Sequence, residues 1–289
     1  MNNHTGIYKS ETGKQLLMEK YDSILQKAPF QFTPHTVQTR FGDTFLIQSG
    51  KEENPPLLLL HGASSNLLSW LGEIPSLNKY FNVIAVDVIG EPGKSDQTRL
   101  DYQSQGYAVW LEEIVSWLKF DKVALMGTSQ GGWLSLQYTV HHPEKVDKLV
   151  LISPAGISHT KLSFILKAIL YSMSGKSGVK KLNRYVIGPE KIDQDAEAFM
   201  ELVQTHVIQR FSKEYLFTDE ELKRFIMPVL LVGGDKDVVR SNQAIADRLR
   251  VLLPNFSFLL LPGVGHVIPS VSDKVIPFLQ PLLQKEHCG

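Results

Sequence analysis

Ser129 lies in the pentapeptide Gly127-Thr128-Ser129-Gln130-Gly131, a spacing that could turn a serine hydroxyl into a nucleophile. The residues before it, 123–126, are apolar like a buried strand, and the residues after it begin like an apolar helix. A serine at such a turn has a strained backbone that points its hydroxyl into a cleft. The helix aims its N-terminal N–H groups at the same point, where an oxyanion would form. Side chains at Gly127 and Gly131 would collide with the neighbouring strand and helix.

By itself the pentapeptide also fits a glycine-rich turn without chemistry, so the partners that a serine needs are decisive. Serine is a poor nucleophile unless a base lies within hydrogen-bond reach and a carboxylate orients that base. Asp237 follows the apolar run 228–234, and His266 follows the run 256–261. Open α/β sheets place their sites at the carboxyl ends of parallel strands. The sequence therefore predicts Ser129, His266 and Asp237 as nucleophile, base and orienting acid.

Apolar runs typical of buried strands alternate with helical patterns along most of the chain. This alternation predicts an α/β fold, with a mostly parallel sheet and helices on both faces. A helical pattern over 11–26 comes before the sheet, a hairpin pattern surrounds Gly42-Asp43, and a helical pattern over about 272–284 ends the chain. The apolar runs are 56–60, 81–87, 123–126, 146–153, 228–234 and 256–261.

The alternation stops after residue 156, and only helical patterns remain up to about residue 226. We therefore divide the chain into an N-terminal helical arm (1–31), a first core part (32–156), a helical cap insertion (157–226) and a second core part (227–289). The insertion carries a basic cluster, which fits a solvated helix face better than a site for an anionic substrate. The cluster consists of Lys176, Lys180, Lys181 and Arg184.

The composition excludes several classes of protein. The 289 residues are 43% hydrophobic with a net charge of +0, which suits one large globular domain and predicts no attraction to nucleic acid or to an anionic membrane. A single cysteine, Cys288, precludes an intrachain disulfide. With no signal-peptide pattern and no apolar run of about 20 residues, the sequence predicts a soluble cytoplasmic protein. No metal-ligand or dinucleotide motif appears, so we expect neither metal nor cofactor, and no oligomeric state is predicted.

From about Phe32 onward the chain resembles the α/β-hydrolase superfamily, and within it the bacterial carboxylesterases with a helical cap. Four motifs in the order of that family carry the resemblance: His61-Gly62, the serine pentapeptide, Gly234-Asp235-Lys236-Asp237 and Gly265-His266. The resemblance implies an eight-stranded sheet whose second strand is antiparallel, with the cap after the sixth strand.

One loop departs from the family. After Asp87 relatives read D-x-x-G-x-G-x-S, whereas this chain has Gly90-Glu91-Pro92-Gly93-Lys94-Ser95, which is one residue longer. The shape of this wall of the pocket therefore cannot be carried over from the family.

The resemblance implies a role for each residue of the site. Ser129 would attack a carbonyl carbon, His266 would take its proton and return it to the leaving group, and Asp237 would hold the imidazole tautomer. The backbone N–H groups of Ala63 and Gln130 would stabilise the oxyanion. Water would then hydrolyse the acyl-enzyme.

Other polar residues near these motifs have competing interpretations. Asp235 competes with Asp237 as the acid, but the family places its acid three residues after Gly234, at Asp237. Asp235 would then be a turn residue. The resemblance makes the ring of His61 a brace for the oxyanion loop, and Asp87 is interpreted as structural.

The sequence favours a serine hydrolase that cleaves carboxylic esters of small to medium apolar substrates. The cap and the apolar residues near the motifs indicate a hydrophobic pocket. The same triad also serves C–C bond hydrolases, amidases and acyltransferases, and the fold also carries ligand-binding proteins without catalysis. The expected partner is a small-molecule ester. The expected pocket residues are Leu67, Trp70, Trp133, Val238 and Val267.

Overall fold

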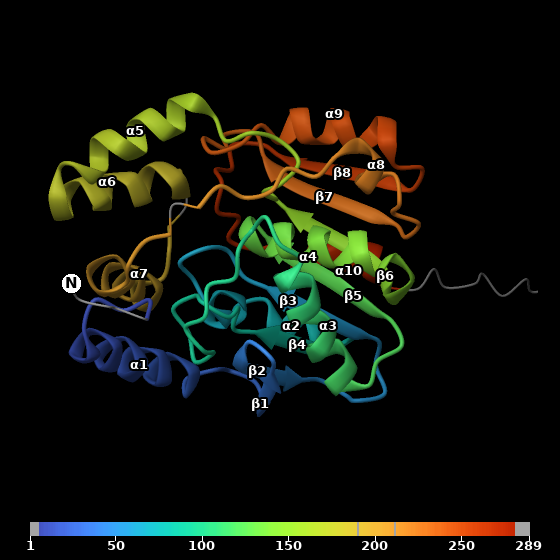
Figure 1. Ribbon diagram of the computed structural model, residues 1–289, viewed down its shortest axis with the longest axis horizontal. Coiled ribbons are helices and arrows are strands. Elements are labelled where there is room, and N and C mark those ends of the chain that lie inside the picture. The colour runs from blue at the N-terminus through green and yellow to red at the C-terminus, as the bar shows by residue number, and fades with distance from the viewer. Residues whose placement is uncertain (1–5, 190, 211, 281–289) are drawn as a thin grey trace, which may run out of the picture.

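A computed structural model describes residues 6–189, 191–210 and 212–280 of the chain (Figure 1). Its centre is an eight-stranded sheet with the order β1-β2-β4-β3-β5-β6-β7-β8. β2 runs antiparallel to β1 and β4, and the remaining pairs are parallel, as the family resemblance implies. The strands are β1 (Thr33–Thr39), β2 (Gly42–Ser49), β3 (Pro56–Leu60), β4 (Asn82–Val86), β5 (Val123–Thr128), β6 (Val146–Ile152), β7 (Val229–Gly234) and β8 (Phe256–Leu261).

Side chains alternate along the strands, so the sheet divides the core into two layers. Leu58 and Leu60 of β3 belong to one buried cluster, and Leu57 and Leu59 belong to the other. The first layer contains α3 (Gly106–Leu118), α4 (Gln130–His141), α8 (Asp219–Leu222) and α9 (Asn242–Leu252). The second contains α1 (Glu11–Leu25), α2 (Ile74–Leu77), α7 (Gln194–His206), α10 (Ser272–Leu279) and the 3-10 helix η1 (Leu67–Trp70); a second 3-10 helix is η2 (Pro143–Lys145).

α1 joins two parts of the chain that are far apart in sequence. It packs against α7, and Lys20 of α1 and Lys27, which follows the helix, both form ion pairs with Asp195 of α7. On the core side, the Tyr21 hydroxyl donates a hydrogen bond of 2.9 Å to Asp87. The N-terminal helix therefore ties the inserted segment to the sheet.

The described residues of the segment 157–226 form four helices: α5 (Leu162–Ser172), α6 (Gly175–Ile187), α7 and α8. α5 and α6 pack on each other as a hairpin that projects from the body of the molecule, at the upper left of Figure 1. The basic cluster of the sequence lies on α6, which the sequence patterns did not reveal as a helix.

Two details differ from the sequence-based expectations. The hairpin turns at Arg40-Phe41 rather than at Gly42-Asp43, because Thr39 pairs directly with Gly42 and Gly42 begins β2 with a φ of 123°. α10 ends at Leu279, and the expected continuation to Gln284 falls outside the described residues. None of the helices in the described ranges is long and apolar enough to cross a lipid bilayer.

Candidate active site

Ser129 sits at the junction of β5 and α4, where the backbone makes the sharp turn expected from the pentapeptide. Its φ of 51° and ψ of −108° are strained for a residue with a side chain. Its N–H donates to the carbonyl of Ile152 at 2.9 Å, which holds the turn against β6. A Cβ atom on Gly131 would lie 2.0 Å from the Leu60 carbonyl oxygen, and one on Gly127 would lie 2.3 Å from that of Gly131. The glycines therefore permit the close approach that the turn requires.

The structure brings together the three side chains that the sequence analysis singled out. His266 follows β8, and its Nε2 lies 3.2 Å from the Oγ of Ser129. Its Nδ1 lies 2.8 Å from Oδ2 of Asp237, which follows β7. His266 and Asp237 are buried, whereas Ser129 is half-buried and can be reached from solvent. The hydroxyl, the imidazole and the carboxylate thus form one continuous line of hydrogen bonds.

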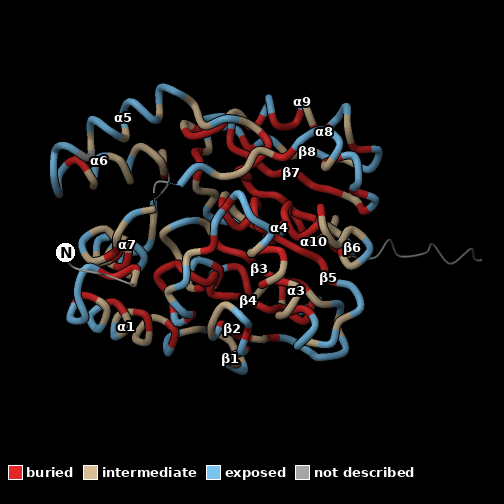
Figure 2. Tube along the Cα trace, in the orientation of Figure 1, coloured by how far each residue is buried: buried red, intermediate tan, exposed pale blue. Residues whose placement is uncertain are grey.

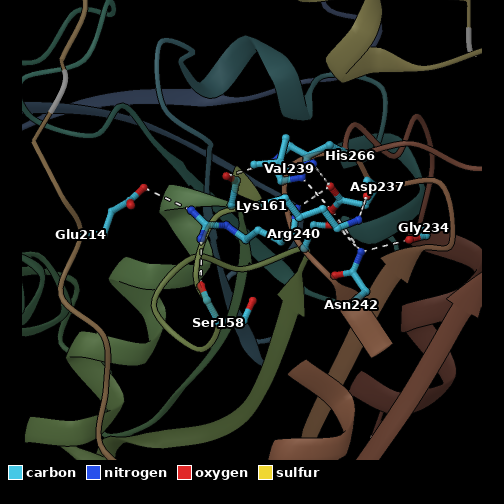
Figure 3. Close-up of polar contacts among 11 residues, drawn as sticks. Ser158, Lys161, Glu214, Gly234, Asp237, Val239, Arg240, Asn242 and His266 are labelled. Atoms are coloured by element: carbon cyan, nitrogen blue, oxygen red, sulfur yellow. Dashed lines mark hydrogen bonds and ion pairs between the residues drawn. The ribbon is translucent and has the colours of Figure 1, made fainter. Parts of the chain in front are cut away.

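A hydrogen-bond network holds the carboxylate of Asp237 in place (Figure 3). Oδ1 accepts from the backbone N–H groups of Val239 at 2.7 Å and Arg240 at 3.0 Å, and Oδ2 also accepts from Nδ2 of Asn242 at 3.1 Å. Burial raises the pKa of Asp237, but the bonds from His266 and from the backbone outweigh burial, so the net pKa lies below the usual value. Asp237 is therefore ionised and oriented toward His266. The sequence analysis did not identify Asn242 as part of the site.

Asp235, the competing acid, occupies a different place. It is exposed, and its Oδ1 accepts a hydrogen bond of 2.7 Å from the N–H of Gly263 in the loop that leads to His266. The carboxylate that contacts the imidazole is that of Asp237. Asp235 instead holds the turn before His266, in agreement with its expected role as a turn residue.

The two predicted oxyanion donors belong to neighbouring chain segments. Gln130 is the first residue of α4, where backbone N–H groups have no partner within the helix. The loop with Ala63 passes close to the serine, since a Cβ atom on Gly62 would lie 3.7 Å from the Ser129 Cβ. This places both segments beside the serine hydroxyl.

His61 braces this loop. The N–H of Val88 donates to its Nε2 at 2.9 Å, so Nδ1 carries the proton and donates to the Gly62 carbonyl at 2.8 Å. Full burial lowers the pKa of His61 to about 4, so its ring is neutral at physiological pH.

Glu91 is a buried carboxylate beside the site that sequence reasoning missed. It lies in the loop with one residue more than the family pattern D-x-x-G-x-G-x-S, and that extra residue was the available signal. Its Oε2 accepts from the N–H of Ser64 at 2.8 Å, and its Oε1 accepts from the side-chain amide of Gln130 at 3.0 Å. Glu91 therefore bridges the two segments that carry the predicted oxyanion donors. Burial raises its pKa, although these two bonds oppose the rise.

Asp87 organises the base of the same loop. Its carboxylate accepts from the N–H groups of Leu67 at 2.8 Å and Lys94 at 2.7 Å as well as from Tyr21. Complete burial raises the pKa of Asp87 to about 6. These contacts agree with a structural role.

The five predicted pocket residues fall into two groups. Leu67, Trp70 and Trp133 are at most 4% exposed and belong to the two core clusters. The indole N–H of Trp133 also donates to the carbonyl of Tyr215 in the inserted segment. Val238 and Val267 are half-buried next to Asp237 and His266. Their role in substrate binding stays a prediction.

Comparison with known proteins places this geometry in context. Residues 55–175 match the family model of the alpha/beta hydrolase fold. The chain is 28% identical to carboxylesterase YbfK of Bacillus subtilis, over 90% of this chain and 92% of the relative. The crystal structure of a naproxen esterase from Bacillus subtilis superposes with a TM-score of 0.82 at 26% identity, covering 94% of this chain and all of the other.

A second crystal structure, that of carboxylesterase CesB (YbfK) from Bacillus subtilis, superposes with a TM-score of 0.79 at 24% identity, over 92% of this chain and 95% of the other. Together with the sheet topology, these matches show that the chain has the α/β-hydrolase fold and that it resembles bacterial carboxylesterases.

Proposed function

We propose that the protein hydrolyses carboxylic esters of small to medium apolar substrates, with Ser129 as the nucleophile. The observation that carries this proposal is the continuous line of hydrogen bonds from Ser129 through His266 to Asp237. The strained backbone at Ser129 supports it, because such strain is concentrated where a side chain must be held for chemistry.

In the first half of the proposed reaction, Nε2 of His266 takes the hydroxyl proton of Ser129 as Oγ attacks the ester carbonyl carbon. The carbonyl oxygen becomes an oxyanion that accepts from the N–H groups of Ala63 and Gln130. When the tetrahedral intermediate collapses, the imidazolium returns its proton to the departing alkoxide. The products of this half are an alcohol and an acyl-enzyme.

The second half repeats these steps with water. His266 takes a proton from the water that attacks the acyl carbon, and it then protonates Ser129 as the carboxylic acid leaves. Asp237 fixes the ring orientation in both halves and balances the charge of the imidazolium. The ionised state of Asp237, which its lowered pKa supports, suits this role.

The apolar character of the substrate is inferred from the surroundings of the site. Val238 and Val267 flank the acid and the base, and the relatives named above include esterases. Because relatives are named carboxylesterases, we extend carboxylic esters as the substrate class to this chain.

Hydrolysis of p-nitrophenyl butyrate tests the proposal. Ser129→Ala is expected to abolish turnover, and Asp237→Asn should lower kcat by roughly 10³-fold or more, because the imidazole loses its tautomer and charge partner. Asp235→Asn is the matched control and should leave kcat unchanged. Full turnover by Ser129→Ala would refute the proposal.

A fluorophosphonate probe separates an enzyme from a ligand-binding protein on the same fold. A serine activated by its histidine should label in the wild type and not in Ser129→Ala. Absence of labelling in the wild type would favour the binding protein.

A further inference from the structure

The outer face of α5 is an exposed apolar surface. Six large aliphatic side chains on α5 and the residue after it are between 41% and 80% exposed. Their spacing of three and four residues puts them on one side of the helix. We call this surface the α5 stripe; it consists of Leu162, Ile165, Leu166, Ile169, Leu170 and Met173. Figure 2 shows the exposed colour along much of α5.

The opposite side of α5 is the side that packs against the protein. Phe164, Ala168 and Tyr171 are half-buried, and the Tyr171 ring meets that of Tyr185 on α6 at 6.5 Å between centroids. α5 therefore presents its more apolar face to solvent, the reverse of the usual surface helix. Contiguous apolar patches of this kind mark interaction or membrane sites in soluble proteins.

The charged side chains within residues 157–189 all have the same sign, although Lys180 forms an ion pair with Glu201 of α7. Residues 157–189 contain six lysines and arginines and no aspartate or glutamate. The rest of the chain therefore has 24 basic and 30 acidic residues, a net charge of −6, which cancels the +6 of this segment. The zero net charge of the whole chain, from which we expected no attraction to anionic membranes, hides this local excess.

We propose that the α5–α6 hairpin docks the protein on an anionic lipid surface, with the α5 stripe inserted among the lipid headgroups. An apolar helix face next to lysines and arginines is the combination that binds such surfaces peripherally. Each basic residue near an anionic leaflet adds attraction, and the aliphatic side chains add burial.

Charge and residue type argue against two other binding partners for the α5 stripe, a second copy of the chain and a different protein. A second copy of the chain would bring two segments of charge +6 together, which is repulsive. A protein partner is disfavoured because the stripe has only Leu, Ile and Met, whereas the centres of protein interfaces are rich in Trp, Tyr and Arg.

The hairpin is attached to the candidate active site at both ends. Lys161 directly precedes α5. Its backbone N–H donates to the carbonyl of Val239 at 2.8 Å, and its Nζ donates to the carbonyl of Asp237 (Figure 3). Near the end of α6, the carbonyl of Val186 accepts from the N–H of His266 at 3.2 Å. A lipid surface that binds the hairpin would therefore lie close to the loops of the acid and the base.

Vesicle flotation with the purified full-length protein tests this inference, and it needs no turnover, so it is independent of the proposed function. Wild type should bind vesicles of equimolar phosphatidylcholine and phosphatidylglycerol, but not vesicles of phosphatidylcholine alone. Leu166→Asp with Leu170→Asp should reduce binding at least about tenfold. Lys181→Gln should reduce it about fivefold, since one basic residue contributes roughly 1 kcal/mol.

The matched control is Ile226→Asp with Val251→Asp, two exposed apolar side chains outside the hairpin. This pair should bind like wild type, and thermal melting of each variant should show that it folds. Failure of wild type to prefer the anionic vesicles would overturn the proposal, and so would equal losses in the two paired variants. Light scattering that showed a dimer broken by the α5 pair would also overturn it, because a second copy would then cover the stripe.

Discussion

Replacement of Glu91 tests whether a buried carboxylate positions the oxyanion donors. Glu91→Leu preserves the approximate volume and removes both acceptors, so the N–H of Ser64 and the amide of Gln130 lose their partner. Ser64 follows Ala63 directly and has a φ of 55°, a left-handed conformation that is strained without support. We expect the Ala63 N–H to lose its alignment with the oxyanion.

The size of the effect follows from the bond that is lost. A hydrogen bond to a charged acceptor contributes about 1.5–3 kcal/mol. If that amount is lost from the transition state, kcat/KM falls about 10–150-fold, because 1.36 kcal/mol corresponds to tenfold. This range lies at or below the ~10²–10³-fold cost of removing an oxyanion donor altogether.

Glu91→Gln separates hydrogen bonding from charge. The new carbonyl can accept from Ser64, and the new amide can donate to Oε1 of Gln130, which is buried without a partner, once the Gln130 amide turns over. Glu91→Gln should therefore keep most of the activity. Tyr102→Phe removes only the other partner of the Gln130 amide and should have a smaller effect than Glu91→Leu.

The assay is kcat/KM for p-nitrophenyl butyrate, with urea unfolding to show that each variant is folded. Wild-type kcat/KM in folded Glu91→Leu would refute the positioning role. Equal losses in the Leu and Gln variants would show that the charge matters rather than the accepted bonds.

Two further predictions concern stability. Burial raises the pKa of Asp87 to about 6 and lowers that of His61 to about 4. The folded state thus holds the Asp87 proton more tightly than the unfolded state does. Asp87 therefore contributes to the free energy of unfolding below its ordinary pKa of 3.8, and this contribution is lost as pH rises through about 6. The lowered pKa of His61 acts in the opposite direction and makes the free energy of unfolding rise with pH from about 4 to 6.5. Asp87→Asn lacks the contribution of Asp87, so its free energy of unfolding should rise more steeply between pH 4 and 6 than that of wild type, by up to about 3 kcal/mol. Urea titrations at several pH values measure this, and the same pH dependence in both proteins would contradict the prediction. Gly131→Ala should lower the free energy of unfolding by about 3 kcal/mol or more, since its Cβ would lie 2.0 Å from the Leu60 carbonyl oxygen. Gly72→Ala meets nothing within 4 Å and is the control, so similar melting temperatures for the two variants would speak against the packing argument.

The sequence sufficed where local pattern and tertiary structure agree. The apolar runs at 123–126 and 228–234 are buried on both faces of the sheet, so their strands could be recognised without knowledge of their neighbours. Ser129, Asp237 and His266 each follow such a run, and parallel strands bring their carboxyl ends to one edge. For this reason three distant residues could be predicted to meet.

The helix α6 was not predicted from the sequence because its glycines are explained only by a tertiary contact. α6 contains Gly175 and Gly178, which count against a helix in isolation. In the structure a Cβ atom on Gly178 would lie 1.9 Å from the Tyr171 carbonyl oxygen, so the glycine is needed where α5 and α6 approach.

Glu91 escaped for a similar reason. The extra loop residue was visible in the sequence, but its partners Ser64 and Gln130 lie 27 and 39 positions away. The function of a buried carboxylate depends on such partners, and no local pattern encodes them.

The attachment of α1 to α7 has a consequence for synthesis on the ribosome. α1 emerges from the ribosome before α7, because Lys20 and its partner Asp195 are separated by 175 positions. At the usual speed of translation, roughly 10–35 seconds pass before that partner has been made. α1 therefore has to wait for α7 before it can dock there, and nascent chains halted before α7 should leave α1 accessible to proteases and chaperones.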